Sequence, residues 1–314
     1  MGNHRQVRIA NAPVSFGVFG LADAHGVSLA PERLLVELAA LGYSGIDLGP
    51  PGWLGAGPLL RERLDAAGLD LAGGWVDLPF QDRRRYAEQV PDLERALDLF
   101  VAGRGRDEVW WPKPTLAVTS TPEREAHPGG GGTTPSLRLD DDEWKVLATN
   151  IADAAARCRD RGLEPTFHHH ACTFVEAVPE IERFLDLTDV GLTLDTGHLL
   201  MVGGNPVQAL RAWADRVNHV HVKDVLMSKV DEAVQAGADM HEVWRRNLFC
   251  PLGEGDLDLA GVIAAVASID FTGWVVVEQD VVPGQQDSFE RILADQAHNL
   301  EQLTTLGMSD SSRG

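Results

Sequence analysis

The sequence predicts an α/β protein that folds as a single (β/α)8 barrel, in which eight parallel strands are each followed by a helix. Short apolar runs alternate with longer stretches of helical period about eight times along the chain, which is typical of repeated βα units. Several of the runs are almost wholly apolar, as strands buried on both faces of a parallel sheet are. The 314 residues fit one TIM barrel, since this fold takes roughly 250 residues and tolerates insertions.

The expected elements follow from this alternation. Candidate strands cover residues 7–16, 45–49, 69–76, 108–113, 164–170, 190–195, 217–222 and 274–279. Helical patterns cover residues 31–42, 59–68, 84–100, 141–162, 177–187, 206–214, 257–268 and 287–306. Pro31 stands at the start of one helix, and Gly42, Gly68 and Gly162 directly follow three others, where helix capping favours them.

Two segments interrupt the rhythm, and both fall where a barrel has its βα loops. Residues 119–139, after the fourth strand, contain four consecutive glycines and three prolines, which predicts a long mobile loop. Residues 226–256, after the seventh strand, contain the string MHEVWRRNLF, which predicts a short helix over the barrel mouth and hence a lid loop. We expect one catalytic barrel domain over residues 1–307 and a disordered tail over 308–314.

The charge of the chain argues against several classes of partner. The sequence has 27 basic and 47 acidic residues, a net charge of −20, which repels nucleic-acid phosphates and anionic membrane surfaces. No segment has the roughly 18 unbroken apolar residues of a membrane span, and the polar start lacks a secretory pattern, so we expect a cytoplasmic protein. The three cysteines are far apart and are expected to be reduced. The sequence leaves open whether the chain forms a homo-oligomer.

Polar residues gather at the ends of the last four predicted strands, where the side chains of a barrel converge on one mouth. Three histidines end the fifth strand, and a period of two sends His168 and His170 to one face and His169 to the other. The sixth strand ends in Asp195, with His198 three residues later. Taken alone, Asp195 could equally cap the next helix.

The seventh and eighth strands extend this group. His219, His221 and Lys223 share one face of the seventh strand. Glu278 follows three valines in the eighth strand, where a carboxylate needs a partner or a cation. One residue from each of four successive strands thus completes a ligand set for a divalent ion, with room for substrate oxygens: His168, Asp195, His221 and Glu278.

Several strings of the chain resemble, in order and spacing, the xylose isomerase-like TIM-barrel superfamily of sugar phosphate isomerases and epimerases, and most closely its inosose dehydratase branch. These strings are GYSGIDLG, LAGGW, FHHHACT, LDTGH, HVHVKD, PLGEGDLD and GWVVVEQD. The resemblance runs over nearly the whole chain, outside the 119–139 loop and the tail. DTGH, HVKD and the final Glu are specific as a set, although each short string is weak by itself.

The resemblance implies a divalent metal ion, with Mn2+ as the first expectation and Co2+, Mg2+ or Zn2+ as the others. Three of the ligands that it implies fall on Asp195, His221 and Glu278. At the fourth position most members have Glu, whereas this chain has His168. Members of the inosose dehydratase branch also carry a His-rich string there. We therefore assign His168 as a ligand and His170 as a substrate contact or substitute ligand.

Enzymes of this kind remove a proton α to a carbonyl, and a divalent ion stabilises the resulting enediolate as a Lewis acid. The remaining need is an acid and a base, for which His198, Lys223 and His170 are the candidates. Structural alternatives are ligand orientation for His198 and a salt bridge with Asp224 for Lys223.

Five residues are candidate substrate contacts, and each has a structural alternative. Trp75, Trp53 and Phe16 follow early strands, where aromatic rings stack on sugars or pack in the core. Glu254 lies in a glycine-flanked loop that either approaches the mouth or is merely solvated. Arg245 meets a substrate anion or belongs to a charged helix face. Neither GGNP nor GEGD has the setting of a nucleotide-binding loop, so we expect no nucleotide or organic cofactor.

The first expectation for function is a metal-dependent lyase, a dehydratase that acts on a keto-cyclitol or keto-sugar by α-proton abstraction and β-elimination. One alternative is a ketose epimerase or aldose-ketose isomerase that uses the same enediolate without elimination. Another is a non-catalytic sugar-binding barrel with a structural ion. His168 and the GGW string favour the dehydratase branch.

Overall fold

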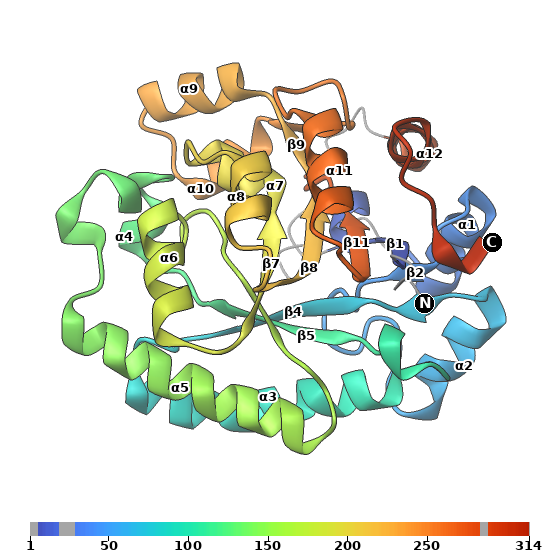
Figure 1. The fold of residues 1–314 in the computed structure, drawn as a ribbon, viewed down its shortest axis with the longest axis horizontal. Helices are drawn as coiled ribbons and strands as arrows, with labels where there is room; N and C mark the ends of the chain where they lie inside the picture. Colours follow the sequence, from blue (N-terminus) through green and yellow to red (C-terminus); the bar gives the residue numbers. More distant parts are fainter. Residues whose placement is uncertain (1–5, 19–28, 283–287, 314) are drawn as a thin grey trace.

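The computed structural model describes residues 6–18, 29–282 and 288–313. Its main sheet curves into a barrel with helices around the outside (Figure 1). The parallel strands of this sheet are, in chain order, β1 (Val7–Asn11), β2 (Gly45–Ile46), β3 (Asp70–Leu71), β4 (Gly73–Leu78), β5 (Lys113–Val118), β6 (Thr166–His168), β7 (Gly191–Asp195), β8 (Val217–Val222) and β11 (Gly273–Val277). Two short strands, β9 (Asp224–Val225) and β10 (Phe249–Cys250), form an antiparallel pair of their own.

One chain segment closes the barrel. Only Ala72 separates β3 from β4, and β3 pairs with β2 while β4 pairs with β5. The remaining neighbours follow the order β2, β1, β11, β8, β7, β6, β5, all parallel. Since β3 and β4 together fill the third of eight positions, the (β/α)8 TIM barrel predicted from the sequence is confirmed.

Helices follow the barrel strands, and most of them match the predicted helical patterns. They are α1 (Pro31–Leu41), α2 (Pro58–Ala67), α3 (Arg83–Ala102), α4 (Pro122–Glu125), α5 (Asp141–Asp160), α6 (Val178–Leu187), α7 (Thr196–Met201), α8 (Pro206–Ala212), α9 (Met227–Gln235), α10 (Met240–Arg245), α11 (Leu259–Ser268) and α12 (Phe289–Thr305). Short 3-10 helices are η1 (Pro13–Phe16), η3 (Glu108–Trp110), η4 (Gly130–Gly132), η5 (Pro135–Leu137) and η6 (Ser311–Arg313). None of the helices in the described ranges is long and apolar enough to cross a membrane.

The fourth strand differs from its predicted position at 108–113. Residues 108–110 form η3, which begins where the Asp107 side chain accepts a hydrogen bond from the Val109 amide at 3.0 Å. The strand itself is β5, which begins at Lys113 and is almost wholly buried. The valine and tryptophans of the first segment favour a strand by propensity alone, but Trp110 packs instead against Trp274, with ring centroids 5.6 Å apart.

The amino-terminal end of the barrel is filled by side chains. The guanidinium of Arg8 lies 4.6 Å from the ring centroid of Trp274 and 5.4 Å from that of Trp110. Arg8 also forms an ion pair with Asp70 at 2.6 Å. Because these groups plug one end, the open end lies at the carboxyl termini of the strands, where this fold places its active sites.

The segment after β5, residues 119–139, is more ordered than its glycines and prolines predict. It contains α4, η4 and η5, and Arg124 of α4 is fully buried. Arg124 binds Glu180 of α6 through two bonds of 3.1 Å and lies 3.2 Å from Glu176. These ion pairs hold the segment against the chain that follows β6.

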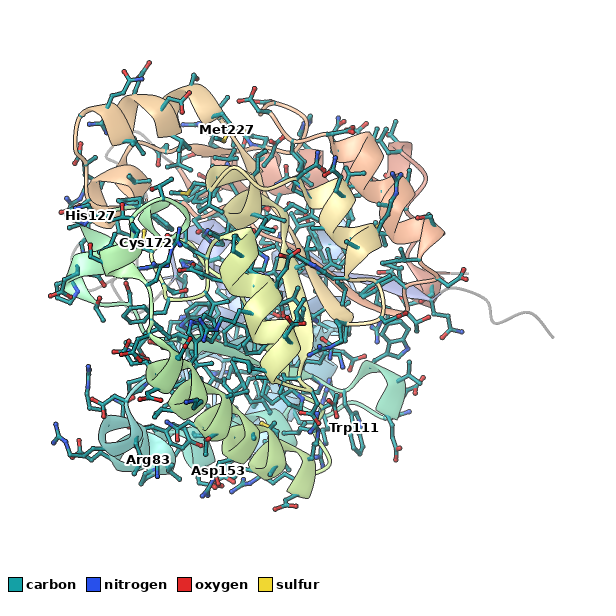
Figure 2. All side chains as sticks on the ribbon, turned by 60° about the vertical axis from the view of Figure 1, so that its left-hand side comes forward. Arg83, Trp111, His127, Asp153, Cys172 and Met227 are labelled. Carbon is teal, nitrogen blue, oxygen red and sulfur yellow. The ribbon has the colours of Figure 1, made fainter. Side chains whose placement is uncertain are left out.

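The same contacts fix the turn between β6 and α6. The Glu176 side chain accepts hydrogen bonds from the amides of Gly131 at 2.7 Å and Cys172 at 2.6 Å. Figure 2 shows His127 and Cys172, one from each segment, on the same side of the molecule. Cys172 has a positive φ of 68°, a backbone conformation that side chains rarely adopt. The 119–139 segment thus braces the turn that carries His170.

The segment after β8 forms a small unit of its own. Helices α9 and α10 lie beyond the ends of β7 and β8 (Figure 1), and their buried faces pack with β9, β10 and α7 in a separate apolar cluster. Residues 226–256 thus contain two helices, α9 and α10, and the short strand β10. Near the end of the described residues, Asp310 accepts a hydrogen bond from the Ile9 amide at 2.7 Å. The disordered tail over 308–314 stays a prediction, and residue 314 lies outside the described residues.

Replacing Arg124 by Met leaves Glu176 and Glu180 buried without their cation. We expect the free energy of unfolding in urea to fall by about 3–5 kcal/mol, the usual effect of removing one partner of a buried ion pair. The matched control is Arg84→Met, which breaks an exposed pair with Glu88 of 3.1 Å and should cost less than about 1 kcal/mol. Equal losses in the two variants would contradict the bracing role of Arg124.

Candidate metal centre

The structure brings the four predicted metal ligands together. His168 ends β6, Asp195 ends β7, His221 lies in β8, and Glu278 directly follows β11. Each contributes one nitrogen or oxygen atom, and these four atoms all lie within 4.8 Å of one another. All four residues are buried. His170, the other candidate for the fourth ligand, belongs to a neighbouring group with His198 and Asp280.

The separations suit a single small cation. His168 Nε2 lies 3.3 Å from Asp195 Oδ2, and His221 Nδ1 lies 3.2 Å from Glu278 Oε2 and 3.8 Å from Asp195 Oδ2. Two ligands bound to one ion at about 2.1 Å are separated by roughly 3 to 3.5 Å. Neither His168 Nδ1 nor the ring nitrogens of His221 make a hydrogen bond within the described residues. The donor set of two imidazoles and two carboxylates therefore fits a divalent ion.

Asp195 both caps a helix and faces the centre. Its Oδ1 accepts a hydrogen bond from the His198 amide at 2.9 Å, which starts α7, and its Oδ2 points toward His168. The Asp195 amide donates to His169 Nε2 at 3.2 Å. The capping and ligand interpretations of Asp195 are thus compatible, because each uses a different oxygen.

A buried lysine joins the carboxylates of the centre. Lys223 Nζ lies 3.4 Å from Asp195, 3.0 Å from Glu278 and 2.8 Å from Asp280. It also lies 3.1 Å from His198 Nε2. A Cβ at Gly197 would lie 2.7 Å from Lys223 Cγ, so the glycine of the DTGH string gives this side chain its room. The salt bridge with Asp224 that the sequence suggests as an alternative is not formed.

Asp224 has a structural task instead. Its Oδ2 accepts hydrogen bonds from the amides of Gly253 at 2.9 Å and Gly255 at 3.1 Å, and its Oδ1 accepts one from Leu257 at 3.0 Å. It therefore shapes the loop before α11, while Lys223 turns to the cavity.

Burial and charge together set the protonation states of the centre. Burial opposes ionisation, but Lys223 and the neighbouring histidines hold the pKa of Asp195 well below its usual value. Likewise, His221 and Lys223 overcome the effect of burial and lower the pKa of Glu278. Burial also disfavours a charged His221, yet the carboxylates around it raise its pKa to about 9. His168 behaves oppositely, because burial lowers its pKa to about 3.

The profile of the xylose isomerase-like TIM barrel family matches residues 35–298 of this chain. The chain belongs to this family. An inosose dehydratase from Geobacillus kaustophilus (strain HTA426) is 30% identical over 291 residues, which cover 88% of this chain and 88% of that relative.

Solved structures of related barrels superpose over nearly the whole chain. A D-allulose 3-epimerase from Methylomonas sp. has a TM-score of 0.67 at 17% identity, with 98% of this chain and 100% of that chain covered. The crystal structure of the IOLI protein with a bound zinc atom has a TM-score of 0.67 at 14% identity, with 95% and 98% covered. At these identities the likeness shows the fold alone.

The four-residue cluster opens into a large cavity at the carboxyl ends of the strands, with a volume of about 1080 Å3. Its lining includes His168, His221 and Glu278 of the predicted ligand set, and it also includes all three candidate proton carriers: His170, His198 and Lys223. Of the predicted substrate contacts, Trp75 and Arg245 line it. Trp75 is 41% exposed, and its ring meets His168 and His170 edge-on at 5.3 and 5.0 Å.

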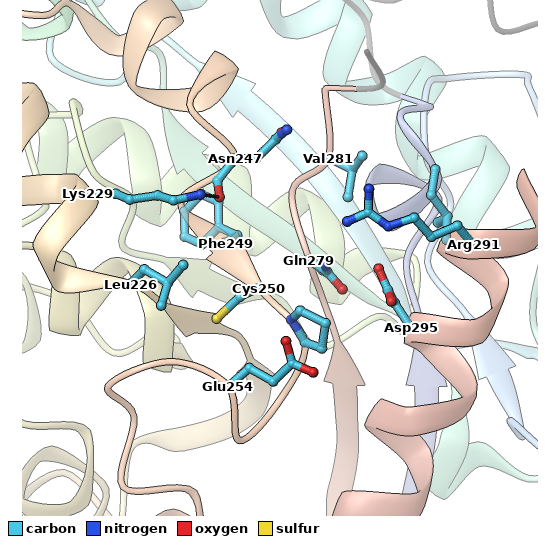
Figure 3. A pocket seen from close by; sticks show the side chains of 12 residues that line it. Leu226, Lys229, Asn247, Phe249, Cys250, Glu254, Gln279, Val281, Arg291 and Asp295 are labelled. Atoms are coloured by element: carbon cyan, nitrogen blue, oxygen red, sulfur yellow. Dashed lines mark hydrogen bonds between the residues drawn. The ribbon is translucent and has the colours of Figure 1, made fainter. Parts of the chain in front are cut away.

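The other three predicted substrate contacts lie elsewhere. Phe16 is buried and packs against Phe289 with ring centroids 5.7 Å apart, while Trp53 donates a hydrogen bond to the Leu29 carbonyl at 3.3 Å. Glu254 lines a separate pocket of about 290 Å3 between the β10 segment and α12 (Figure 3). None of these three residues lines the large cavity, so their roles as substrate contacts stay predictions.

Three residues at the cavity were not singled out from the sequence. Asp47 follows β2 and lies 3.8 Å from His221 Nε2. Asp280 binds Lys223, and Trp244 of α10 donates a hydrogen bond to Asp280 at 3.2 Å. The strings GIDLG and EQD carry a usable signal for the two carboxylates, since each follows an apolar strand. No sequence signal identifies Trp244, because its position at the cavity depends on how α10 packs.

The buried histidines predict how stability depends on pH. Burial lowers the pKa of His169 from 6.5 to about 4. A group whose pKa is lower in the folded state contributes stability that is present above pH 6.5 and lost as the pH falls toward 4. We expect the free energy of unfolding of metal-free protein to decline over this window. In a His169→Gln variant the decline should be shallower, and an unchanged slope would contradict the assignment.

Proposed function

We propose that this protein is a metal-dependent lyase that eliminates water from a keto-cyclitol or keto-sugar. The observation that carries the proposal is the cavity, where a four-ligand cluster adjoins a buried lysine and two further histidines. A relative named as an inosose dehydratase, matched over 88% of its length, supports the same class of reaction. Because the match covers nearly the whole length of relatives that are enzymes, we take this chain to be an enzyme rather than a sugar-binding module.

His168, Asp195, His221 and Glu278 would hold the divalent ion, with Mn2+ proposed first and Co2+, Mg2+ and Zn2+ as the alternatives. When bound, the ion supplies Lewis-acid stabilisation of negative charge that develops on the substrate carbonyl. Compared with family members that have Glu at the fourth position, His168 removes one negative charge from the ligand set. This exchange either favours a softer ion or leaves a bound ion more electrophilic.

The environments of the proton carriers assign an acid and a base. Burial lowers the pKa of His170 to about 4, so its ring is neutral at pH 7. Its Nδ1–H donates to the Ala171 carbonyl at 2.7 Å, which leaves the Nε2 lone pair for a substrate proton. Burial opposes a charge on Lys223, but Asp195, Asp280 and Glu278 raise its pKa, so it remains an ammonium.

In the proposed reaction His170 removes the proton α to the carbonyl and Lys223 protonates the departing β-hydroxyl. The C–H and C–O bonds break, a C=C bond forms, and water leaves, so no oxidant or reductant is needed. His198, 3.1 Å from Lys223, orients the ammonium and can exchange its proton. Trp75 would support the substrate ring from one side of the cavity, and Arg245 would bind a polar group at the rim.

A substrate panel tests the reaction class. Metal-loaded protein is incubated with scyllo-inosose, 3-keto-glucosides and ketohexoses in deuterated water. The proposal expects enone absorbance to appear with at least one substrate. A changed sugar ratio without enone would instead establish an epimerase or isomerase. Absence of deuterium from every recovered substrate and product would contradict both the lyase and the epimerase or isomerase hypotheses.

Glu278→Gln tests the ion site. Loss of one carboxylate ligand should reduce bound metal, measured by elemental analysis after dialysis, from about one ion per chain to well below it. Activity should fall in parallel. Glu290→Gln provides the matched control, since Glu290 is an exposed residue of α12. Unchanged metal content in Glu278→Gln would show that the ion binds elsewhere.

Lys223→Met tests the proposed acid. Methionine is unbranched like lysine but one atom shorter, and it has no proton to donate, so kcat should fall by roughly 10²–10⁴-fold, the usual contribution of general acid–base catalysis. Addition of a substrate analogue whose leaving group needs no proton should restore part of the rate. If kcat of the variant equals that of the wild type, Lys223 is not the acid.

A further inference from the structure

The ring of His221 lies between two sets of carboxylates. Its Nδ1 faces the proposed metal site, 3.2 Å from Glu278 and 3.8 Å from Asp195. Its Nε2 faces away from that site, toward Asp47 Oδ2 at 3.8 Å. An imidazole that gives its Nδ1 lone pair to a metal ion carries its proton on Nε2 and needs an acceptor there.

A polar group surrounds this second nitrogen. Asp47, His219 and His221 are all buried, and one ligand atom from each lies within 4.8 Å of the others. Asp47 Oδ1 and both ring nitrogens of His219 make no hydrogen bond within the described residues. Buried polar atoms of this kind are almost always satisfied, commonly by ordered water with two to four partners.

The three residues reach this place from two strands on opposite sides of β1 and β11. Asp47 directly follows β2, and its amide donates to the Asn11 carbonyl at 2.9 Å. His219 precedes His221 by two residues in β8, so both rings point to the same face, with centroids 5.2 Å apart. The backbone thus fixes the carboxylate and the two imidazoles relative to one another.

We propose that Asp47 is a positioning residue that accepts the Nε2–H of His221 through one water molecule that also binds His219, because 3.8 Å is too long for a direct hydrogen bond. This contact fixes the tautomer and the ring orientation of the metal ligand. The inference rests on the proposed metal site and goes beyond it, because Asp47 itself does not bind the ion. Outer partners of metal-bound histidines typically contribute 10–100-fold to metal affinity.

A second ion held by Asp47, His219 and His221 is the competing explanation. It would require His221 to bind one ion through each ring nitrogen and so to lose both protons. It would also place a cation near Lys113, whose charge lowers the pKa of His219 after the larger effects of burial and of His221. One carboxylate offers little to offset that repulsion, so we favour the positioning role.

The test measures metal binding to the full chain rather than activity. Mn2+ affinity is determined by calorimetry and Co2+ is followed by its visible absorption for the wild type, Asp47→Ala and Asp47→Asn. We expect Asp47→Ala to weaken binding about 10–100-fold and to change the Co2+ bands. Asp47→Asn should weaken it by a smaller factor, because an amide oxygen still accepts a hydrogen bond. Circular dichroism checks that each variant is folded.

Asp77→Asn is the matched control. Asp77 also lines the cavity, is exposed, and accepts a hydrogen bond from the Thr119 hydroxyl at 3.2 Å. Its loss removes the same formal charge without touching His221, so metal affinity should remain within about twofold of the wild-type value if positioning rather than overall charge matters. A drop in affinity as large as that of Asp47→Ala would overturn the proposal.

The remaining outcomes separate the inference from the proposed function. If the wild type binds no divalent ion, the metal site itself fails. If it binds one ion and the Asp47 variants show the same affinity and Co2+ spectrum, the positioning role is overturned. If the wild type binds two ions and Asp47→Ala binds one, Asp47 is a ligand of a second ion. Should Asp47→Ala fail to fold, Asp47→Asn decides by the same criteria.

Discussion

The site depends on one buried ammonium among three carboxylates. Asp195, Glu278 and Asp280 come from two strands at the barrel mouth, and Lys223 lies within 3.4 Å of all three. Without a cation, charges this close in a poorly solvated place would repel one another strongly. Lys223 therefore lets the mouth keep its carboxylates ionised, and the Gly197 backbone leaves the space that its stem needs. Because the ammonium shares Asp195 and Glu278 with the proposed ion, it fixes the two carboxylates that the ion would use.

The three consecutive histidines at the end of β6 have different contacts because the backbone points their side chains in different directions. In β6 the alternation of side chains sends His168 to the centre and His169 to the β7 backbone, where it accepts the Asp195 amide. His170 lies past the end of the strand, in the turn that Glu176 and Arg124 brace. Its ring is consequently half-exposed at the cavity, whereas the rings before it are buried. A run of three identical residues thus supplies a proposed ligand, a structural contact and a proposed base, and the difference comes from backbone position alone.

The barrel and the four-residue cluster could be predicted because both follow from short-range patterns. Strand alternation and the position of the strand ends place His168, Asp195, His221 and Glu278 on one face without knowledge of packing. The errors have tertiary causes. The strand prediction for residues 108–113 is wrong because Trp110 packs against Trp274 at the amino-terminal end of the barrel. Asp47 follows a strand of only two paired residues, whose register the sequence does not specify. Trp244 reaches the cavity only because α10 packs in a separate cluster with α9.

The link between Trp244 and Asp280 connects that separate cluster to the centre. Asp280 uses Oδ1 for Lys223 at 2.8 Å and Oδ2 for the indole N–H of Trp244 at 3.2 Å. The same indole lies nearly parallel to the rings of His170 and His198, with centroids 5.9 and 6.0 Å away. A helix that lines the cavity, α10, and the lysine that would donate the proton therefore share one carboxylate. Burial raises the pKa of Asp280 to about 6 against the pull of Lys223. A hydrogen bond donated by the indole N–H favours the ionised form of this carboxyl. Asp280 thus contacts both the α10 helix, through Trp244, and Lys223.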